Sequence, residues 1–266
     1  MEVKEVWIKY RSRKAEYHIY PIGDIHAGVK HCAEAMIRKR IREIQDDPMA
    51  LVIGMGDYAD YVTPNDKRWD DDVVSIWVDK GDIGKSQEDW VVELFRPIKS
   101  KIMGLLSGNH EQSIRLSNNT RVHGHICERL GVTDLGYTAY VRITFTRSNG
   151  SAYRVTCFFT HGSGWAITKG AKLNKLQRVM DSFEADIYAV GHMHDIITDT
   201  KPYLALNEAG ELKQREKVGA ITGSWFKTYE QGVPASYGER KVYPPTSLGA
   251  PIFTIIPDKK ILSVEG

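Results

Sequence analysis

Polar and apolar residues alternate along several short stretches of the chain, as they do in half-buried β-strands. Residues 3–10 and 16–22 both show this alternation and are separated by a short basic segment, which predicts a β-hairpin. Residues 51–53, 102–106 and 187–190 are short apolar runs typical of fully buried strands. A glycine follows each of these runs within two residues, so each strand is expected to end in a sharp turn.

Helical spacing of apolar residues occurs between these strands. Residues 33–45, 86–95 and 168–183 carry apolar side chains three or four positions apart, which predicts helices. In the second half of the chain, residues 140–146 and 153–160 are strand-like and flank an Asn-Gly turn. Further strands are predicted at 196–206, 218–221, 252–256 and 261–264.

The predicted order of elements is β-α-β-α-β, followed by strands with one more helix. This order favours a single α/β domain over residues 1–266, with two mixed β-sheets packed as a sandwich and flanked by helices. The segment at about 61–100 is long for a connection between neighbouring strands and is interpreted as an insertion. Its tryptophans belong either to a cap over a site or to an added surface helix with ordinary packing. The segment at about 207–250, rich in glycine and proline, is predicted to be loop-rich.

The composition is that of an ordinary globular protein, with 42% hydrophobic and 26% charged residues. The formal net charge of +2 predicts no global field that would drive the chain onto nucleic acid or a membrane. No apolar run approaches the length of a membrane span, and the N-terminus lacks the features of a secretory signal, so a cytoplasmic protein is expected. Three cysteines outside any Cys-x-x-Cys pair argue against a disulfide framework and against thiolate-bound zinc.

A glycine stands next to metal-type side chains at five predicted strand ends. They stand in the motifs Gly23-Asp24-Ile25-His26, Gly56-Asp57-Tyr58-Ala59-Asp60, Gly108-Asn109-His110-Glu111, His161-Gly162 and Gly191-His192-Met193-His194. Each motif alone is typical of an ordinary turn, in which Asp and Asn hydrogen-bond their own loop. The carboxyl ends of strands in an α/β sheet meet along one edge, however, where ligands gather. The ordered set of five therefore predicts a metal site at that edge.

Two other motifs are given structural interpretations. His123 and His125 have the same His-x-His spacing as the last motif but follow no strand, so they are predicted to lie at the surface or at a helix start. Gly84-Lys85-Ser86 ends like a phosphate-binding loop, but Asp79 stands where that loop requires its first glycine. Neither motif is therefore assigned to the site.

The series G-D-x-H, G-D-x-x-D, G-N-H-E, a later His and G-H-x-H resembles the motif set of the calcineurin-like metallophosphoesterases, over residues 23–194. The resemblance implies the four-layer αββα fold of that superfamily and hydrolysis of phosphoesters by a metal-activated hydroxide. It implies one divalent ion held by Asp24, His26, Asp57 and His194, and another held by Asp57, Asn109, His161 and His192. Such nitrogen and oxygen ligands suit Mn²⁺ best, with Fe, Zn²⁺ or Ni²⁺ as alternatives.

The resemblance also implies two catalytic residues that are not metal ligands. In the superfamily, the histidine that matches His110 faces the substrate, where it stabilises developing charge or protonates the leaving oxygen. Asp60 matches the carboxylate that orients this histidine, and the alternative for Asp60 is a loop cap.

The substrate class is predicted less directly. Serine/threonine phosphatases of the superfamily carry an arginine after the second aspartate of G-D-x-x-D, whereas this chain has Tyr61, so a grip on a phosphomonoester is missing. Basic and aromatic residues at 169–178, 225–229 and 237–243 match a groove for single-stranded nucleic acid, or else a solvated helix face and packing aromatics. These features favour a phosphodiesterase or nuclease. The alternatives are a phosphomonoesterase and a non-catalytic metal-binding scaffold, each as a monomer or a homodimer.

Overall fold

The computed structural model describes residues 1–164, 166–207 and 209–266, so residue 208 of the predicted loop-rich segment lies outside the described residues. One sheet has six strands in the order β1 (Glu2–Tyr10), β5 (Thr138–Arg147), β6 (Ala152–Thr160), β7 (Ile187–Val190), β9 (Leu212–Thr222) and β8 (Ile196–Leu206). The other sheet has five strands in the order β11 (Ile261–Glu265), β10 (Ile252–Ile256), β2 (Tyr17–Ile22), β3 (Ala50–Gly54) and β4 (Ile102–Leu105).

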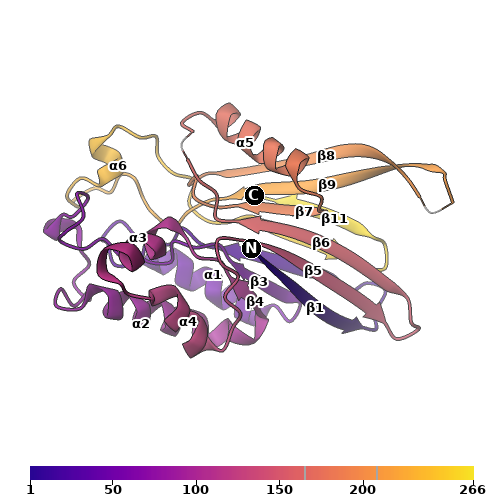
Figure 1. Cartoon of the computed structure of the whole chain (residues 1–266), viewed down its shortest axis with the longest axis horizontal. Helices are drawn as coiled ribbons and strands as arrows, with labels where there is room; N and C mark the ends of the chain where they lie inside the picture. The colour runs from indigo at the N-terminus through magenta and orange to yellow at the C-terminus, as the bar shows by residue number, and fades with distance from the viewer. Residues whose placement is uncertain (165, 208) are drawn as a thin grey trace.

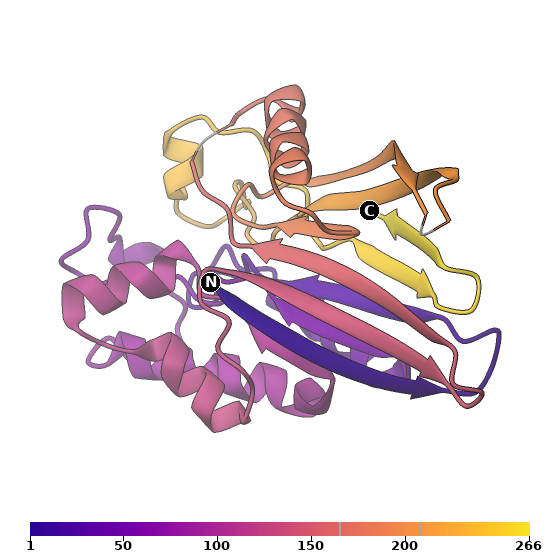
Figure 2. The same ribbon diagram turned by 45° about the vertical axis from the view of Figure 1, so that its right-hand side comes forward.

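The two sheets lie face to face, with helices on both outer faces (Figures 1 and 2). Helices α1 (Glu34–Asp46), α2 (Ile83–Phe95), α3 (Asn109–Asn118) and α4 (Val122–Leu130) cover the five-stranded sheet, and α5 (Lys169–Ser182) covers the six-stranded sheet. The predicted two-sheet α/β architecture is confirmed. Among the described residues, none of the helices combines the length and the apolar character that a bilayer crossing requires.

Three apolar layers hold these elements together. Between the sheets, fully buried side chains such as Ile53 and Phe253 of the five-stranded sheet meet Val141 of the six-stranded sheet. Helix α1 turns Ile37, Ile41 and Ile44 inward at helical spacing, as its periodicity predicts. Leu176 and Met180 do the same for α5. Removing this apolar area from water is the main force that fixes the positions of the strand ends.

The predicted hairpin at residues 3–10 and 16–22 is wrong. Strand β1 pairs in parallel with β5, whereas β2 pairs with β3 and β10 in the other sheet. The connection between β1 and β2 passes from one sheet to the other, and Tyr10, Ala15 and Tyr17 are buried in the core between the sheets. Alternation identified the strands but could not identify their partners, because the partner of β1 lies more than a hundred residues further along the chain.

The predicted loop-rich segment also needs correction. Its first part forms β9, which pairs with β8 along the whole of both strands, from Ile196↔Thr222 to Leu206↔Leu212. The outer half of β9 is polar and exposed on both faces, so it lacks the alternation that predicts a strand. Further along, α6 (Tyr237–Arg240) is a single helical turn in an otherwise irregular stretch.

The insertion at about 61–100 contains both an added helix with packing tryptophans and a wall of a cavity, which were alternatives in the sequence. The ring of Trp77 stacks on that of Trp90 at a centroid distance of 5.7 Å, and Trp77 Nε1 donates a hydrogen bond to Glu34 of α1. These tryptophans therefore pack α2 against α1. The earlier part of the insertion, which includes a 3-10 helix at Asp71–Val73, contributes side chains to the wall of a cavity described below.

Candidate metal centre

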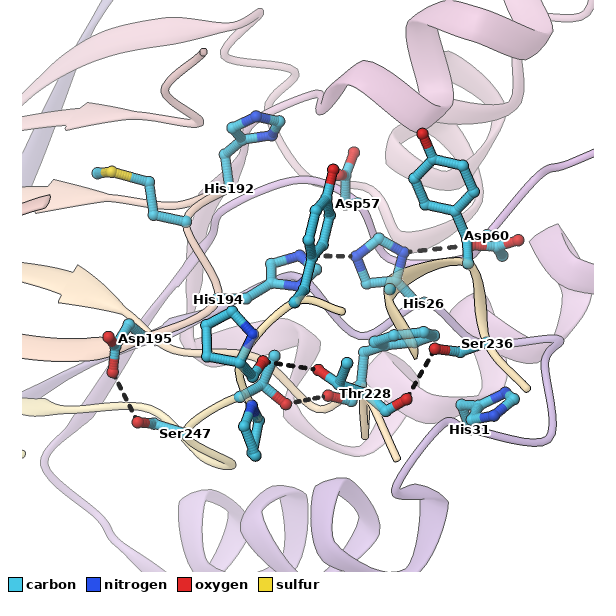
Figure 3. A pocket seen from close by; sticks show the side chains of 18 of the residues that line it. His26, His31, Asp57, Asp60, His192, His194, Asp195, Thr228, Ser236 and Ser247 are labelled. Carbon is cyan, nitrogen blue, oxygen red and sulfur yellow. Dashed lines mark hydrogen bonds and ion pairs between the residues drawn. The ribbon is translucent and has the colours of Figure 1, made fainter. Parts of the chain in front are cut away.

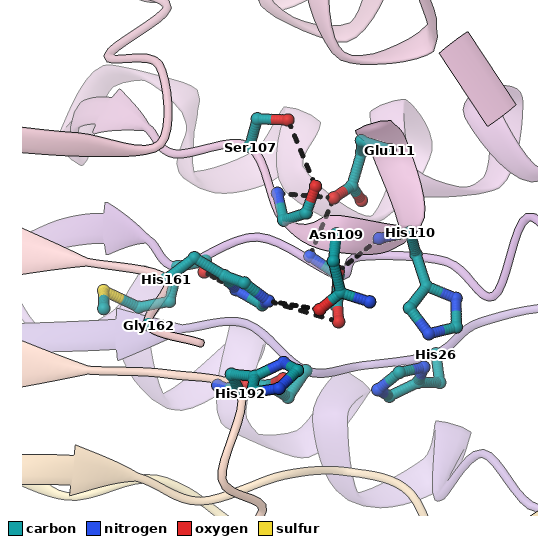
Figure 4. Close-up of polar contacts among 12 residues, drawn as sticks. His26, Ser107, Asn109, His110, Glu111, His161, Gly162 and His192 are labelled. Carbon is teal, nitrogen blue, oxygen red and sulfur yellow. Dashed lines mark hydrogen bonds and ion pairs between the residues drawn. The ribbon is translucent and has the colours of Figure 1, made fainter. Parts of the chain in front are cut away.

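The five motif loops meet at one end of the two sheets. Asp24 and His26 follow β2, Asp57 and Asp60 follow β3, Asn109 and His110 begin α3 after β4, His161 follows β6, and His192 and His194 follow β7. Because β2, β3 and β4 are parallel, as are β6 and β7, each sheet brings its own motif loops to one edge. The structure thus brings together all nine residues that the sequence singled out (Figures 3 and 4).

The backbone at these residues is held in a conformation that L-amino acids seldom adopt. Five of the seven predicted ligands have a positive φ: Asp24 (47°), His26 (50°), Asp57 (51°), His192 (69°) and His194 (48°). Such left-handed residues cost free energy and persist only where the surrounding structure imposes them, often at functional sites. Here the sharp turns direct side chains from different loops into one small space.

Glycines allow two of the loops to touch through their backbones. A Cβ added to Gly108 would lie 2.1 Å from Oδ1 of Asp57, and one added to Gly56 would lie 2.5 Å from the backbone nitrogen of Gly108. No side chain fits at either contact, and Gly56 also has a positive φ of 88°. The glycines of these two motifs are therefore required by the close approach of the loops that follow β3 and β4.

Asp24, His26 and His194 form the first group of donor atoms, all within 4.8 Å of one another. Nε2 of His26 lies 3.0 Å from Nε2 of His194, which in turn lies 3.3 Å from Oδ1 of Asp24. Oδ2 of Asp24 accepts a hydrogen bond from the His192 backbone, but among the described residues its buried Oδ1 has no hydrogen-bond partner. A fully buried carboxylate oxygen without a partner is costly, so this position fits a cation.

Asp57, His161 and His192 form the second group, again within 4.8 Å. Nε2 of His161 lies 3.3 Å from Oδ2 of Asp57 and 3.0 Å from Oδ1 of Asn109. Nδ1 of His161 donates to the carbonyl of Met55, which fixes the orientation of the ring (Figure 4). Four donors thus converge, and they comprise the kinds of nitrogen and oxygen ligand that mid-series divalent ions accept.

The charges of the site also suit cations. Burial would raise the pKa values of Asp24 and Asp57, but histidines beside them outweigh burial and hold both pKa values below the usual range. Burial lowers the pKa of His26 and of His192, which leaves both rings neutral and able to donate a lone pair. Burial would also lower the pKa of His161, but Asp57 raises it to about 10. That proton must leave before His161 can bind a metal.

His110 and Asp60 lie beside the first group, though not in the predicted arrangement. Nδ1 of His110 donates a short hydrogen bond to the backbone carbonyl of Asp60, while Oδ1 of Asp60 is 3.6 Å away. That oxygen is closer to Nδ1 of His26, at 3.3 Å. Asp60 therefore orients His110 through its main chain and pairs its carboxylate with His26. Burial would lower the pKa of His110, but Asp57 and Asp60 raise it above its usual value, so Nε2 can carry a proton as well.

A guanidinium occupies the site although the motif lacks its arginine. Nη1 of Arg68 lies 3.1 Å from Nε2 of His110, and Asp66 holds the group through its Nε and Nη2 atoms. These hydrogen bonds lower the pKa of Asp66 to about 2, so the carboxylate stays charged. The motif's own arginine is absent, with Tyr61 in its place, but Arg68 from the insertion lies beside His110. The sequence held no signal for Arg68, because a side chain in a long loop can point in any direction.

Glu111 is a second residue whose role the sequence did not reveal. Its buried carboxylate accepts hydrogen bonds from three backbone nitrogens, those of Asp57 (2.9 Å), Tyr58 (2.8 Å) and Gly108 (2.7 Å). It therefore ties the loop after β3 to the loop after β4 and fixes the backbone that carries Asp57. The signal was present in the sequence, since Glu111 completes the G-N-H-E motif.

The metal-type donors lie at one end of a cavity of about 770 Å³ (Figure 3). The cavity is lined by motif residues, by the first part of the insertion and by the irregular stretch that contains α6. The ring of Phe226 lies at the junction, 5.5 Å from the ring of His26 and 6.2 Å from that of His194 between centroids. Donors that could hold metal ions thus open onto a space large enough for a small organic molecule.

Two residues of the predicted nucleic-acid groove are buried and cannot contact a polynucleotide backbone. Lys172 is 7% exposed, and its Nζ pairs with Asp195 at 3.2 Å. Trp225 is 2% exposed and belongs to the core under α1. Lys172 lines the cavity together with Lys169 and Tyr237. The basic and aromatic segments therefore contribute partly to packing and partly to the cavity wall.

The second His-x-His pair lies apart from this centre. The predicted helix start is confirmed, since α4 begins at Val122. The surface position is wrong for His123, which is buried, stacks on Tyr58 and contacts Asp134 at 2.9 Å. His125 is half-exposed.

Comparisons with known proteins add little to this geometry. No protein-family model matches the sequence, and no curated protein matches it. Among solved structures, the chain is similar to the NAD nucleotidase (NadN) of Haemophilus influenzae, with 10% sequence identity and a TM-score of 0.44. The match covers 95% of this chain and 49% of that one, so this chain spans about half the length of its neighbour.

Glu111→Ala should destabilise the protein by about 3 kcal/mol or more, because three buried N–H groups would lose their acceptor. Glu111→Gln should cost less, since its amide oxygen still accepts. Urea unfolding measures both changes, with the exposed Glu128→Ala as the matched control. A loss below about 1 kcal/mol for Glu111→Ala would mean that Glu111 does not hold the two loops together.

Proposed function

We propose that the chain is a phosphoesterase that uses two divalent metal ions. The observation that carries this proposal is the meeting of two donor groups, each within 4.8 Å, at one end of a cavity. We assign one ion to Asp24, His26, Asp57 and His194, and the other to Asp57, Asn109, His161 and His192. The Asp24 oxygen without a hydrogen bond among the described residues and the donor chemistry support these assignments, with Mn²⁺ as the favoured ion and Fe, Zn²⁺ or Ni²⁺ as alternatives.

The metal ions would supply Lewis-acid stabilisation of the phosphoryl group and a water molecule whose pKa is lowered toward ~7. The chain itself supplies His110. The Asp60 carbonyl fixes its Nδ1 proton, so its Nε2 is the atom that can meet the substrate. A proton held at Nε2 would pass to the leaving oxygen as the ester bond breaks. The Asp60 carboxylate, paired with Nδ1 of His26, would leave Nε2 of that ring for a metal ion held with Asp24 and His194.

Arg68 supports phosphomonoesters as the substrates. A monoester carries more negative charge than a diester, and a guanidinium beside His110 can bind that charge through paired hydrogen bonds. The sequence favoured a phosphodiesterase or nuclease, but one premise was the missing arginine. The burial of Lys172 and Trp225 removes part of the other premise. Diester hydrolysis therefore becomes the second candidate.

A non-catalytic metal-binding scaffold is the alternative from another functional class. Loss of chemistry would show as missing donors or as a missing acid, whereas here the seven donors lie together beside a cavity that His110 and Arg68 line. A scaffold would bind the metal without turnover, which the following comparison detects.

Asp57→Asn and His110→Ala should separate metal binding from catalysis. The wild type reconstituted with Mn²⁺ should approach two ions per chain and hydrolyse p-nitrophenyl phosphate. Asp57→Asn should lose both ions, because Asp57 serves both. His110→Ala should keep the metal content while turnover falls by ~10²–10⁴, the usual contribution of a positioned acid or base. Elemental analysis and a chromogenic assay measure the two quantities.

Three results would contradict this assignment. Loss of metal in His110→Ala would make His110 a ligand. Unchanged metal content in Asp57→Asn would remove the shared ligand. Two bound ions without hydrolysis of either a monoester or a diester would favour the scaffold.

Arg68→Ala should act selectively on phosphomonoesters. We expect the wild type to cleave p-nitrophenyl phosphate faster than bis-p-nitrophenyl phosphate. Loss of charged hydrogen bonds should lower kcat/KM for the monoester by about 10- to 100-fold and that for the diester by about threefold or less. Asp66→Asn should give a smaller loss with the same selectivity, and Arg121→Ala, exposed on α4's N-terminal side, is the matched control. A diester preference in the wild type, or equal losses on both substrates, would favour a phosphodiesterase.

A further inference from the structure

The cavity continues beyond the metal-type donors into a part that the proposed hydrolysis does not use. The ring of Phe226 lies 5.5 Å from the ring of His26 and 5.6 Å from that of His31. Phe226 therefore contacts a proposed metal ligand on one side and His31 on the other. In Figure 3, His31 and Ser236 lie on the opposite side of the pocket from His192. We call this outer part the organic-group chamber, lined by Val29, His31, Val73, Phe226, Tyr237 and Pro245.

The wall of the organic-group chamber is attached to the metal-binding loop. The backbone nitrogen of Trp225 donates to the carbonyl of Asp24 at 2.9 Å, and that of Lys227 donates to the carbonyl of His31, also at 2.9 Å. Trp225 is buried in the core. Phe226, between these two anchors, is therefore held in place by the fold, and the chamber has a fixed position relative to the phosphate site.

His31 offers the chamber a polar atom that the protein itself does not use. Its side chain is almost fully buried (1% exposed), yet among the described residues its buried Nε2 has no hydrogen-bond partner. Burial lowers the pKa of His31, so the ring is neutral near pH 7. A neutral imidazole donates at one nitrogen and accepts at the other, and a buried polar atom without a partner is costly. A ligand that pairs with Nε2 would remove that cost.

Three other polar groups of the cavity wall are already paired. Ser236 Oγ donates to the carbonyl of Thr228 at 2.7 Å, and Thr228 Oγ1 donates to that of Pro244 at 3.3 Å. Of the cations at the cavity, Arg240 is paired with Asp70 at 2.6 Å. These pairs weaken the attraction of this part of the cavity for a second anionic group. The aromatic and aliphatic side chains around His31 favour a flat apolar ring instead.

We propose that the organic-group chamber binds a planar heteroaromatic ring of the substrate, with a polar edge atom of that ring hydrogen-bonded to His31. The substrates are then phosphomonoesters of heteroaromatic compounds, held with the phosphate at the metal end. The ring of Phe226 lies between the rings of His26 and His31, at 5.5 Å and 5.6 Å between centroids. A ligand that extends from the phosphate at the metal end to His31 therefore needs a fused ring or a ring on a short linker. This inference rests on the proposed function, because that function places the phosphate.

Phosphonates test this inference by binding alone, since they are not hydrolysed. The probes are methylphosphonate, naphthylmethylphosphonate and a set of quinolinylmethylphosphonates that differ from the naphthyl compound by one ring nitrogen. Calorimetric titration of the Mn²⁺-loaded protein should give a naphthyl affinity about tenfold or more above that of methylphosphonate, from burial of the ring. At least one quinolinyl isomer should bind about three- to tenfold tighter again, from one hydrogen bond. Equal affinities for methyl and naphthyl probes, or for naphthyl and all quinolinyl probes, would overturn the proposal.

His31→Phe locates the hydrogen bond. The ratio of naphthyl to quinolinyl dissociation constants should fall to about one in this variant, whereas His125→Phe, on α4 outside the cavity, should keep the wild-type ratio. A wild-type ratio in His31→Phe would overturn the role of His31. The ligand series in the wild type needs no variant, so a folding defect in His31→Phe leaves the test decisive. Turnover of p-nitrophenyl phosphate without any ring preference would sink this inference and leave the phosphoesterase intact.

Discussion

The burial of two carboxylates beside each other is the constraint on which the rest of this structure depends. Asp24 and Asp57 are both almost inaccessible to solvent, and each lies against the histidines of the neighbouring loops. Like charges in a medium of low dielectric repel each other strongly unless cations or hydrogen bonds compensate. Glu111 shows how a buried carboxylate is stabilised by the protein alone, since three backbone N–H groups surround it. Among the described residues, one oxygen of Asp24 has no hydrogen-bond partner, which leaves that position to a cation.

The fold meets this constraint by bringing the motif loops of both sheets together at one end of the sandwich. Loops from both sheets bring their side chains to the same space. Left-handed residues turn these loops sharply, and glycines let their backbones approach closely. Each left-handed residue costs about 1–3 kcal/mol, and the apolar layers within and outside the sandwich offset that cost. The same packing anchors Trp225 and therefore Phe226, so the metal end and the organic-group chamber share one rigid frame.

The sequence predicted those features of the fold and the site that depend on local pattern. A glycine next to metal-type residues marked each of five strand ends, and these metal-type residues all lie at the site. Partners that depend on long-range contacts could not be predicted from the sequence. Strand β1 pairs with a distant strand, and Arg68 and His31 reach the cavity from irregular loops. Lys172 is intermediate, because it lies four positions before Leu176 and eight before Met180, which puts it on the buried face of α5. Periodicity could have identified it as a buried lysine, although its partner Asp195 could not be foreseen.

The central claim is that these donors hold two ions with Asp57 between them. Anomalous diffraction from crystals grown with Mn²⁺ tests it most directly, because it locates each ion without any assay of activity. Two ions that share Asp57 should give two peaks ~3.5–4 Å apart, the usual spacing in two-metal sites. One peak should lie beside His26 and His194, the other beside Asn109 and His161, with Asp57 in contact with both. A single peak, or two peaks that do not share Asp57, would contradict it.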